Sequence, residues 1–153
     1  MRPFQAFFES HRTAVWRFCA ASVGRADADD VFQETFLAAL RGYDRRRAGA
    51  SGHAWVMTIA HHKAMDHHRA ARRRAVPAAE LPDIPHHDAP SDGEDPIWLR
   101  VRALPPKQRA AVTLRSVADL SHAEVAKVLG CTEEAARRSA HEGLKRLRQE
   151  LPA

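Results

Sequence analysis

The chain has 153 residues, of which 28% are charged and 44% hydrophobic, and its formal net charge is +5. A chain of this length forms one domain or two small ones, and neither half can bury a large core alone. It contains no signal-peptide pattern and no apolar run long enough to cross a membrane, so we expect a cytoplasmic protein without membrane insertion. The basic balance predicts an anionic partner but does not select nucleic acid over a membrane surface.

The charges are distributed in three blocks. Residues 1–74 carry a net charge of +6, residues 75–96 a net charge of −6, and residues 97–153 a net charge of +5. The middle block has five prolines and no Lys or Arg, which predicts an extended, poorly ordered acidic linker. Proline is rare on either side and strand-like alternation is absent. The sequence therefore predicts an all-α fold of two small helical domains, 1–74 and 97–153, joined by the linker 75–96.

Three helices are predicted in the first block. Apolar residues at helical spacing indicate a helix over residues 4–21. Asp27 is predicted to cap a second helix that runs toward Gly42. A polar loop over residues 43–52 then leads to a third helix that ends near residue 74. Trp55 is in register with Ile59 on this helix, which favours a core anchor over a base-stacking platform.

The last third of the chain has the pattern of a helix-turn-helix. Ser121 and Glu124 form a capping box, and Gly130 is placed to end that helix in a left-handed conformation. Thr132 can cap the second helix, where Glu133 and Glu134 suit the positive end of the helix dipole. The alternative is an ordinary amphipathic helical hairpin with a solvated basic face.

The second helix of this pair has an apolar face and a basic one. The apolar positions are Ala136, Ala140, Leu144, Leu147 and Leu151. The basic positions are Arg137, Arg138, His141, Lys145 and Arg148. A basic helix in this position is typical of DNA recognition.

Cysteine and histidine give no sign of a metal site. Cys19 and Cys131 lie far apart without a neighbouring partner, so we expect unpaired packing roles in a reducing compartment. The ten histidines include the run His61 to His68, but the spacing matches no zinc pattern. We expect exposed helix histidines, no metal, no cofactor and no enzymatic activity.

Three segments together carry a family resemblance. Residues 27–40 read DADDVFQETFLAAL, and residues 54–69 read AWVMTIAHHKAMDHHR. The third segment runs from LPPKQR at 104–109, through EVAKVLG at 124–130, to LKRLR at 144–148. In this order they resemble a sigma-70 family RNA polymerase sigma factor of the compact extracytoplasmic-function type.

The resemblance implies three groups of binding residues. The second helix would bind the clamp helices of the polymerase largest subunit through Asp29, Asp30, Gln33 and Glu34. The promoter −10 region would be contacted by Tyr43, Arg45, Arg46, Arg47, His53, His62, Arg69 and Arg73. The −35 region would be contacted by Thr132, Ala135, Arg137, Arg138, Ser139, His141, Lys145 and Arg148.

The resemblance also implies the partners, which are core RNA polymerase, through its clamp helices and flap, and promoter DNA. Family members are commonly inhibited by an anti-sigma factor, so the resemblance allows such a third partner, although nothing in this sequence identifies one. The acidic linker either enters the basic channel of the polymerase or serves as an extended spacer. Two other classes stay open: a free-standing, dimeric helix-turn-helix regulator, and a helical interaction protein whose DNA-like features are incidental.

Overall fold

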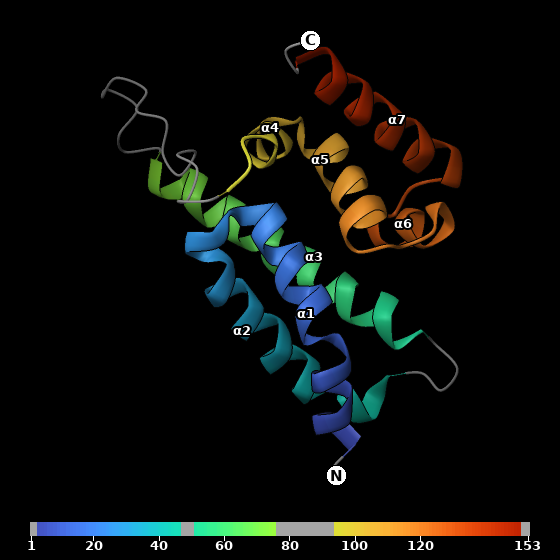
Figure 1. The fold of residues 1–153 in the computed structure, drawn as a ribbon. Helices are drawn as coiled ribbons and strands as arrows, with labels where there is room; N and C mark the ends of the chain where they lie inside the picture. The colour runs from blue at the N-terminus through green and yellow to red at the C-terminus, as the bar shows by residue number, and fades with distance from the viewer. Residues whose placement is uncertain (1–2, 47–50, 76–93, 151–153) are drawn as a thin grey trace.

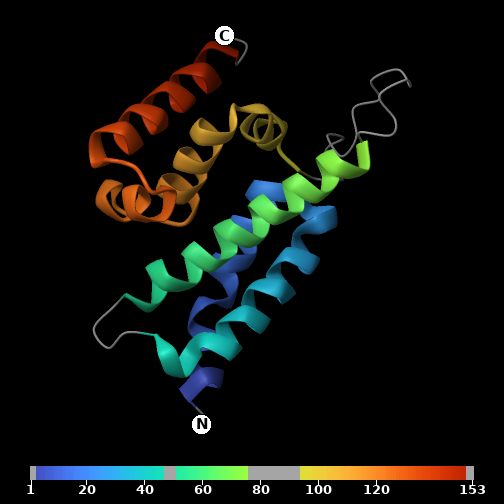
Figure 2. The same cartoon turned by 180° about the vertical axis from the view of Figure 1, so that it is seen from behind.

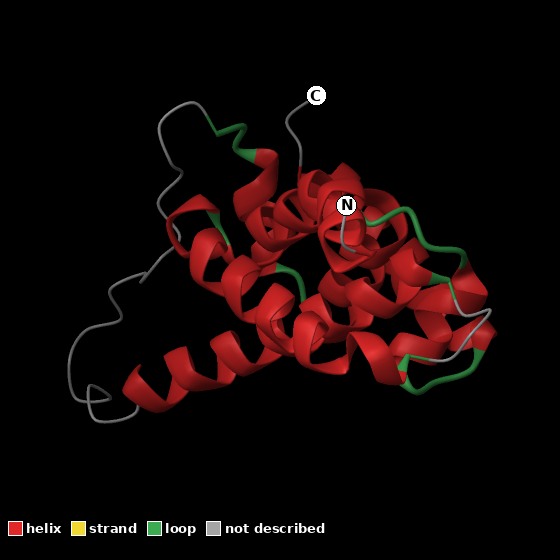
Figure 3. Ribbon diagram, turned by 90° about the horizontal axis from the view of Figure 1, so that it is seen from below, coloured by secondary structure: helices red, strands yellow, loops and turns green. Residues whose placement is uncertain are grey.

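The structure, a computed structural model, describes residues 3–46, 51–75 and 94–150. Within these ranges the chain forms helices, turns and short loops, and no strand (Figure 3). This confirms the predicted all-α class. None of the helices in the described ranges combines the length and the apolar character that a membrane span requires.

Three helices form the N-terminal half: α1 (Pro3–Val23), α2 (Arg25–Gly42) and α3 (Gly52–Ala75). α1 and α2 lie side by side, and α3 runs along this pair (Figures 1 and 2). Apolar side chains at helical spacing, such as Val15 and Phe18 of α1, are fully buried between them. All three helices were predicted from the sequence.

The turn between α1 and α2 differs from the prediction. Gly24 alone reverses the chain, with a φ of 89° in the left-handed region that glycine favours. α2 therefore begins at Arg25, and no side chain caps it. The prediction that Asp27 caps this helix is wrong. Asp27 lies in the first turn, and its Oδ2 atom lies 3.2 Å from Nε2 of His67 on α3.

The predicted polar loop after α2 is partly helical. Tyr43–Arg45 forms a 3₁₀ turn, η1, directly after Gly42. Residues 47–50 lie outside the described residues, and the predicted −10 residue Arg47 is among them. Trp55 packs against the core and makes an edge-on contact with Phe7 at 5.7 Å between ring centroids, which confirms its predicted anchoring role.

The C-terminal half begins with α4 (Ile97–Ala103) and α5 (Pro106–Val112). A π-helical turn, η3 (Thr113–Val117), continues α5. The helix-turn-helix follows as α6 (His122–Leu129) and α7 (Glu133–Glu150). α7 packs on α5 and α6 and lies on the outer side of this group (Figure 1).

Local hydrogen bonds fix the helix-turn-helix as predicted. The Glu124 amide donates to Ser121 Oγ at 3.1 Å, and the Ser121 amide donates to Glu124 Oε1 at 2.9 Å. Gly130 has a φ of 68° and ends α6. Thr132 Oγ1 accepts from the Ala135 amide at 3.1 Å at the start of α7. The capping box, the glycine stop and the second cap are thus confirmed.

The apolar face of α7 is confirmed in part. Ala136, Ala140 and Leu147 are buried, but Leu144 is 39% exposed. Leu151 lies outside the described residues. Leu144 faces a cleft beside η3 instead of the core.

One cluster of buried side chains continues across both halves. It includes Phe18 of α1 and Met57 of α3 from the first half, and Leu114, Leu120 and Val125 from the second. α1 contacts η3 and α4, and α3 contacts α6. The predicted division at 1–74 and 97–153 stays a prediction, since the two halves share a core in this arrangement.

The end of the predicted linker is ordered at Glu94. Arg102 Nη1 donates to Glu94 Oε1 at 2.7 Å, and both side chains are almost fully buried. The Arg102 guanidinium also packs beside Gly24, at the turn between α1 and α2. Through this packing on Gly24, Arg102 connects the start of the C-terminal half to the first half, and the ion pair with Glu94 balances its buried charge. The remaining linker residues, 76–93, lie outside the described residues.

Two expectations about cysteine and histidine are wrong. Cys131 is exposed in the turn before α7, because the left-handed Gly130 ends the helix and leaves the next residue outside the core. His61 is only 6% exposed, because the C-terminal half covers this side of α3. Cys19 is buried as expected, and burial raises the pKa of its thiol to about 12.

Candidate polymerase and nucleic-acid interfaces

The outer face of α2 combines acidic and apolar side chains. Asp30, Gln33 and Glu34 are all exposed and follow one another at helical spacing. Leu37 and Leu40 continue this surface with 52% and 55% exposure, although they are large hydrophobic residues. The sequence reasoning named the acidic residues and missed the two leucines, which a helical projection of residues 30–40 would have placed beside them.

Asp29, the fourth predicted residue of this patch, is oriented by α1. Trp16 Nε1 donates a hydrogen bond to Asp29 Oδ1 at 3.0 Å. Asp29 remains exposed, so its second oxygen can still accept from a partner. Trp16 was not singled out from the sequence, because its relation to Asp29 depends on how α1 and α2 pack.

The aromatic residues near the start of α1 enclose two of the predicted −10 residues. Tyr43 packs edge-on against Phe4 at 5.3 Å between ring centroids. Arg46 lies over the Tyr43 ring at 4.6 Å and also donates to its hydroxyl. Tyr43 and Arg46 thus stabilise each other in this arrangement, whereas Arg45 is exposed at the same end.

His53, at the start of α3, contacts the C-terminal half. Its Nε2 atom lies within hydrogen-bonding distance of the Ala118 carbonyl oxygen, just after η3. Its ring also lies 5.8 Å from that of His11 on α1. The structure therefore places this predicted −10 residue at a contact between the two halves.

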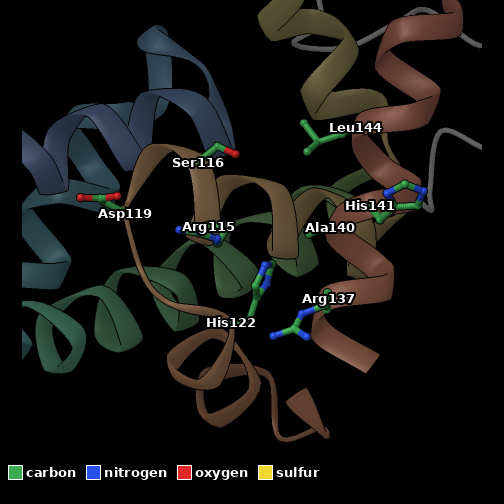
Figure 4. A pocket seen from close by; sticks show the side chains of 8 residues that line it. All are labelled: Arg115, Ser116, Asp119, His122, Arg137, Ala140, His141 and Leu144. Carbon is green, nitrogen blue, oxygen red and sulfur yellow. The ribbon is translucent and has the colours of Figure 1, made fainter. Parts of the chain in front are cut away.

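The helix-turn-helix has a cleft of about 600 Å³ on one side (Figure 4). Arg137 and His141 of α7 line one wall, and Arg115 of η3 lines the facing wall. Arg115 is held by a hydrogen bond from its Nη1 to the Leu120 carbonyl at 3.2 Å. Arg137 makes an exposed ion pair with Glu133 at 3.0 Å. The cleft thus brings two predicted −35 residues together with an arginine that the sequence reasoning missed.

A larger groove, of about 950 Å³, lies between α3 and the C-terminal half. Its lining includes His62 and Arg69, which were predicted to contact the −10 region. It also includes Ala135, Arg138 and Ser139, which were predicted to contact the −35 region. Both sets of residues therefore line one groove in this arrangement. Arg73, Lys145 and Arg148 are exposed outside it.

The floor of this groove holds two histidines with altered pKa values. Burial, with smaller effects from His62 and Arg109, lowers the pKa of His61 to about 4. Burial also lowers the pKa of His68 to about 4, with a further effect from Arg109. Both side chains are therefore neutral at pH 7. In the described part of the chain, no cluster of three or more His, Cys, Asp or Glu residues could hold a metal ion.

Comparison with known proteins agrees with this arrangement of helices. The family model for sigma-70 region 2 matches residues 7–74, and the model for sigma-70 region 4 matches residues 94–147. Both boundaries agree with the helical groups described above. The chain therefore belongs to the sigma-70 family of RNA polymerase sigma factors.

Its relatives include several sigma factors of the extracytoplasmic-function type. The factor SigD of Mycobacterium tuberculosis is 38% identical, over 95% of this chain and 75% of the relative. SigC of the same species is 34% identical, over 85% of this chain and 73% of the relative. A further relative, the RNA polymerase sigma factor CarQ of Myxococcus xanthus, is 33% identical over 97% of this chain and 88% of the relative. Within the family, this chain is of the extracytoplasmic-function type, and its function is to direct promoter recognition by RNA polymerase.

Solved structures share the fold. The sigma factor RpoE from Bartonella quintana, solved with the anti-sigma factor NepR, has a TM-score of 0.81 at 21% identity, with 97% of this chain and 96% of that chain covered. CnrH, solved with the cytosolic domain of CnrY, has a TM-score of 0.70 at 23% identity, with 95% of this chain and 85% of that chain covered. At these identities the likeness is one of fold.

Proposed function

We propose that two exposed surfaces of this sigma factor, the outer face of α2 and the cleft face of the helix-turn-helix, bind different partners. The outer face of α2 binds core polymerase, and the cleft face of the helix-turn-helix binds the −35 element. His62 and Arg69 on α3 contact the −10 region. The chain performs no chemistry itself and supplies promoter specificity to the polymerase. The observation that carries this proposal is the exposed acidic and apolar face of α2 on an otherwise basic N-terminal half.

The α2 face suits a basic protein surface and not DNA. The carboxylates of Asp30 and Glu34 would repel the phosphates of DNA. The same two carboxylates would be attracted to a basic pair of helices on a partner protein. Leu37 and Leu40 supply the apolar area that a stable protein contact needs, and they are the exposed large hydrophobic residues of α2. The chain thus keeps an acidic and apolar surface for a protein and separates it from the basic surfaces.

The cleft face of the helix-turn-helix suits DNA. Arg137 lies in the N-terminal part of α7, the part of a recognition helix that reaches base edges. Its guanidinium can read guanine through two hydrogen bonds. Arg115 lies on η3, across the cleft from α7. A DNA phosphate at the edge of the major groove that α7 reads could lie between Arg115 and α7. Arg137 would then specify sequence and Arg115 would fix position.

Polymerase binding is tested by charge reversal on α2. The double variant Asp30→Arg plus Glu34→Arg should lose at least about tenfold in affinity for core polymerase in a pull-down, because like charges would face each other. It should lose run-off transcription in parallel. Glu9→Arg, an exposed acidic residue on α1, is the matched control and should behave as the parent chain. Equal binding by the double variant and the parent would refute the α2 assignment.

DNA reading is tested with promoters that carry single −35 substitutions. Arg137→Ala should cost about 1–3 kcal/mol of promoter affinity and relax specificity at one position. Arg115→Ala should weaken all promoters alike and reduce the salt dependence. Arg12→Ala, exposed on α1, serves as the control. Unchanged specificity in Arg137→Ala would show that this arginine does not read bases.

The shared groove argues against a free-standing regulator. The −10 and −35 elements are roughly 25 base pairs apart, or about 85 Å of duplex at about 3.4 Å per step. His62 and Arg138 line one groove, so they cannot contact both elements until the halves separate. We expect weak promoter binding by the chain alone and strong binding with core polymerase. Tight, specific duplex binding without polymerase would favour the regulator instead.

The solved relatives RpoE and CnrH suggest a third partner. RpoE was solved with an anti-sigma factor and has the same fold as this chain. We therefore include an anti-sigma factor among the proposed partners. Such a protein should co-purify with the tagged chain and inhibit run-off transcription. Failure of every co-purifying protein to inhibit would remove this partner.

A further inference from the structure

The groove between α3 and the C-terminal half collects cations that lack acidic partners. Arg72 of α3, Lys107 and Arg109 of α5, and Arg138 of α7 all line it. Among the described residues, no carboxylate lies within ion-pair distance of these four. The one acidic residue of the lining, Asp27, is paired with His67. Within the described part of the chain, the groove therefore has an uncompensated positive charge.

Arg109 differs from the other three cations of the groove because its side chain is partly buried. Its Nη1 atom donates to the Arg102 carbonyl at 3.2 Å. Burial and the neighbouring Arg72 both lower the pKa of Arg109. Arg102, by contrast, is buried with a carboxylate of its own, Glu94. A partly buried cation without a counter-ion is costly, and a structure normally supplies one.

A second unsatisfied group lies beside Arg109. The Nε2 atom of His68 is buried and has no hydrogen-bond partner within the described structure. Arg109 and Arg72 are both close enough to disfavour a proton on this ring. An anion between the three side chains would compensate the two arginines and would favour a proton on Nε2 of His68, which could then donate a hydrogen bond to it.

We propose that this groove is a binding site for an oligophosphate, either inorganic or part of a nucleotide. Four uncompensated cations match a chain of about three phosphates better than a single anion. The volume of about 950 Å³ falls within the usual range for small-molecule sites. Met65 and Leu129 give the groove an apolar wall, against which a nucleoside could pack.

The ligand would join the two halves. Arg72 comes from α3, whereas Arg109 and Arg138 come from the C-terminal half. A polyanion held by all three stabilises the closed arrangement through binding linkage. If the chain acts as proposed above, on which this consequence rests, the bound ligand would keep Arg69 and Arg138 away from promoter DNA.

Calorimetric titration of the full chain with sodium tripolyphosphate tests the site. We expect saturable one-to-one binding that Arg109→Gln and Arg72→Gln each weaken by about tenfold, the effect of one charge-assisted contact. Arg12→Gln, an exposed arginine of α1 outside the groove, should bind as the parent does. Sulfate at the same ionic strength should not saturate the site. No saturation at millimolar tripolyphosphate, or an equal loss in Arg12→Gln, overturns the proposal.

Thermal unfolding separates a binding role of Arg109 from a structural one. Without ligand, Arg109→Gln should be at least as stable as the parent chain, because the substitution removes an uncompensated charge. With tripolyphosphate, the parent should gain stability and the variant should not. A variant that is destabilised without ligand and still gains the full shift would contradict the site. A second titration with ATP shows whether the apolar wall binds a nucleoside.

Run-off transcription without added oligophosphate keeps the two proposals distinguishable. A sigma factor that transcribes normally but does not bind tripolyphosphate would remove only the groove proposal. A chain that binds tripolyphosphate but does not support transcription would remove only the proposed function. Inhibition of transcription by tripolyphosphate in the parent, but not in Arg72→Gln, would support both.

Discussion

At the scale of single residues, the surroundings of each arginine determine what it can do. Arg102 is paired with Glu94 and packs beside Gly24 of the first half. Arg109 is partly buried without a carboxylate partner among the described residues, which makes it a candidate anion ligand. Arg137 is exposed, and its ion pair with Glu133 is worth little in water, so it can leave that partner for a base.

Gly143 gives a prediction at the same scale. A Cβ atom at this position would lie 2.6 Å from Cγ2 of Val112, because α7 packs closely on α5 there. Gly143→Ala should therefore destabilise the chain by about 1–3 kcal/mol, although alanine is by itself the better helix former. Urea unfolding followed by circular dichroism measures this, with the exposed Glu142→Ala as control. Equal midpoints for Gly143→Ala and the parent would show that α5 and α7 can move apart at low cost.

At the scale of elements, helix ends set the geometry of the helix-turn-helix. The capping box of Ser121 and Glu124 starts α6, and the left-handed Gly130 ends it. Thr132 then starts α7 after one further residue. These three local features set where α6 begins, where it ends and where α7 begins. They therefore fix the length of the turn and the orientation of α7 relative to α6.

The N-cap of α6 can be tested directly. Ser121→Ala removes the acceptor of the Glu124 amide, and we expect a loss of about 0.5–2 kcal/mol in the free energy of unfolding. Ser10→Ala is the control, because the Ser10 hydroxyl only donates to the Ala6 carbonyl within α1. Chemical denaturation of both variants gives the comparison. A loss in Ser121→Ala no larger than that in Ser10→Ala would mean that water replaces the cap without cost.

At the scale of the whole molecule, the two halves close over buried histidines. His61 is almost fully covered, and His68 lies nearby on the same side of α3. Several charged or titratable groups face them from the packed elements: Asp27, His62, His67, Arg72, Arg102, Lys107, Arg109 and Arg138. Most of these groups are cations and only one is a carboxylate. A proton on either histidine would therefore be repelled by the positive charges around it.

The closed arrangement should therefore lose stability in acid. The pKa of His61 and that of His68 are lowered to about 4, whereas an unfolded histidine titrates near 6.5. Between these values the unfolded chain binds more protons, so the free energy of unfolding falls as the pH falls from about 6.5 toward 4. The loss should be at most about 1.4 kcal/mol per pH unit for His61 and smaller for the more exposed His68.

Urea unfolding at several pH values between 4 and 7 measures this effect. His61→Gln should be less sensitive to pH than the parent chain, because one titrating group is removed. His141→Gln, on the exposed face of α7, should keep the parental dependence. If all three chains show the same pH profile, the buried histidines do not control stability in this range.

The local features were predictable because each depends on residues close in the chain. The capping box, the glycine stop, the cap at Thr132 and the acidic face of α2 all follow from side chains a few positions apart. The family resemblance rests on the same kind of short pattern. By itself, the sequence determined the all-α class, the three N-terminal helices, the helix-turn-helix and the family.

Other features required the tertiary structure. The π turn at η3 brings Arg115 opposite α7, and nothing in residues 113–117 alone indicates it. The burial of His61, the pairing of Glu94 and the groove that joins α3 to α7 depend on residues far apart in sequence. Burial is decided by which surfaces pack together, and periodicity within one helix cannot specify its partner.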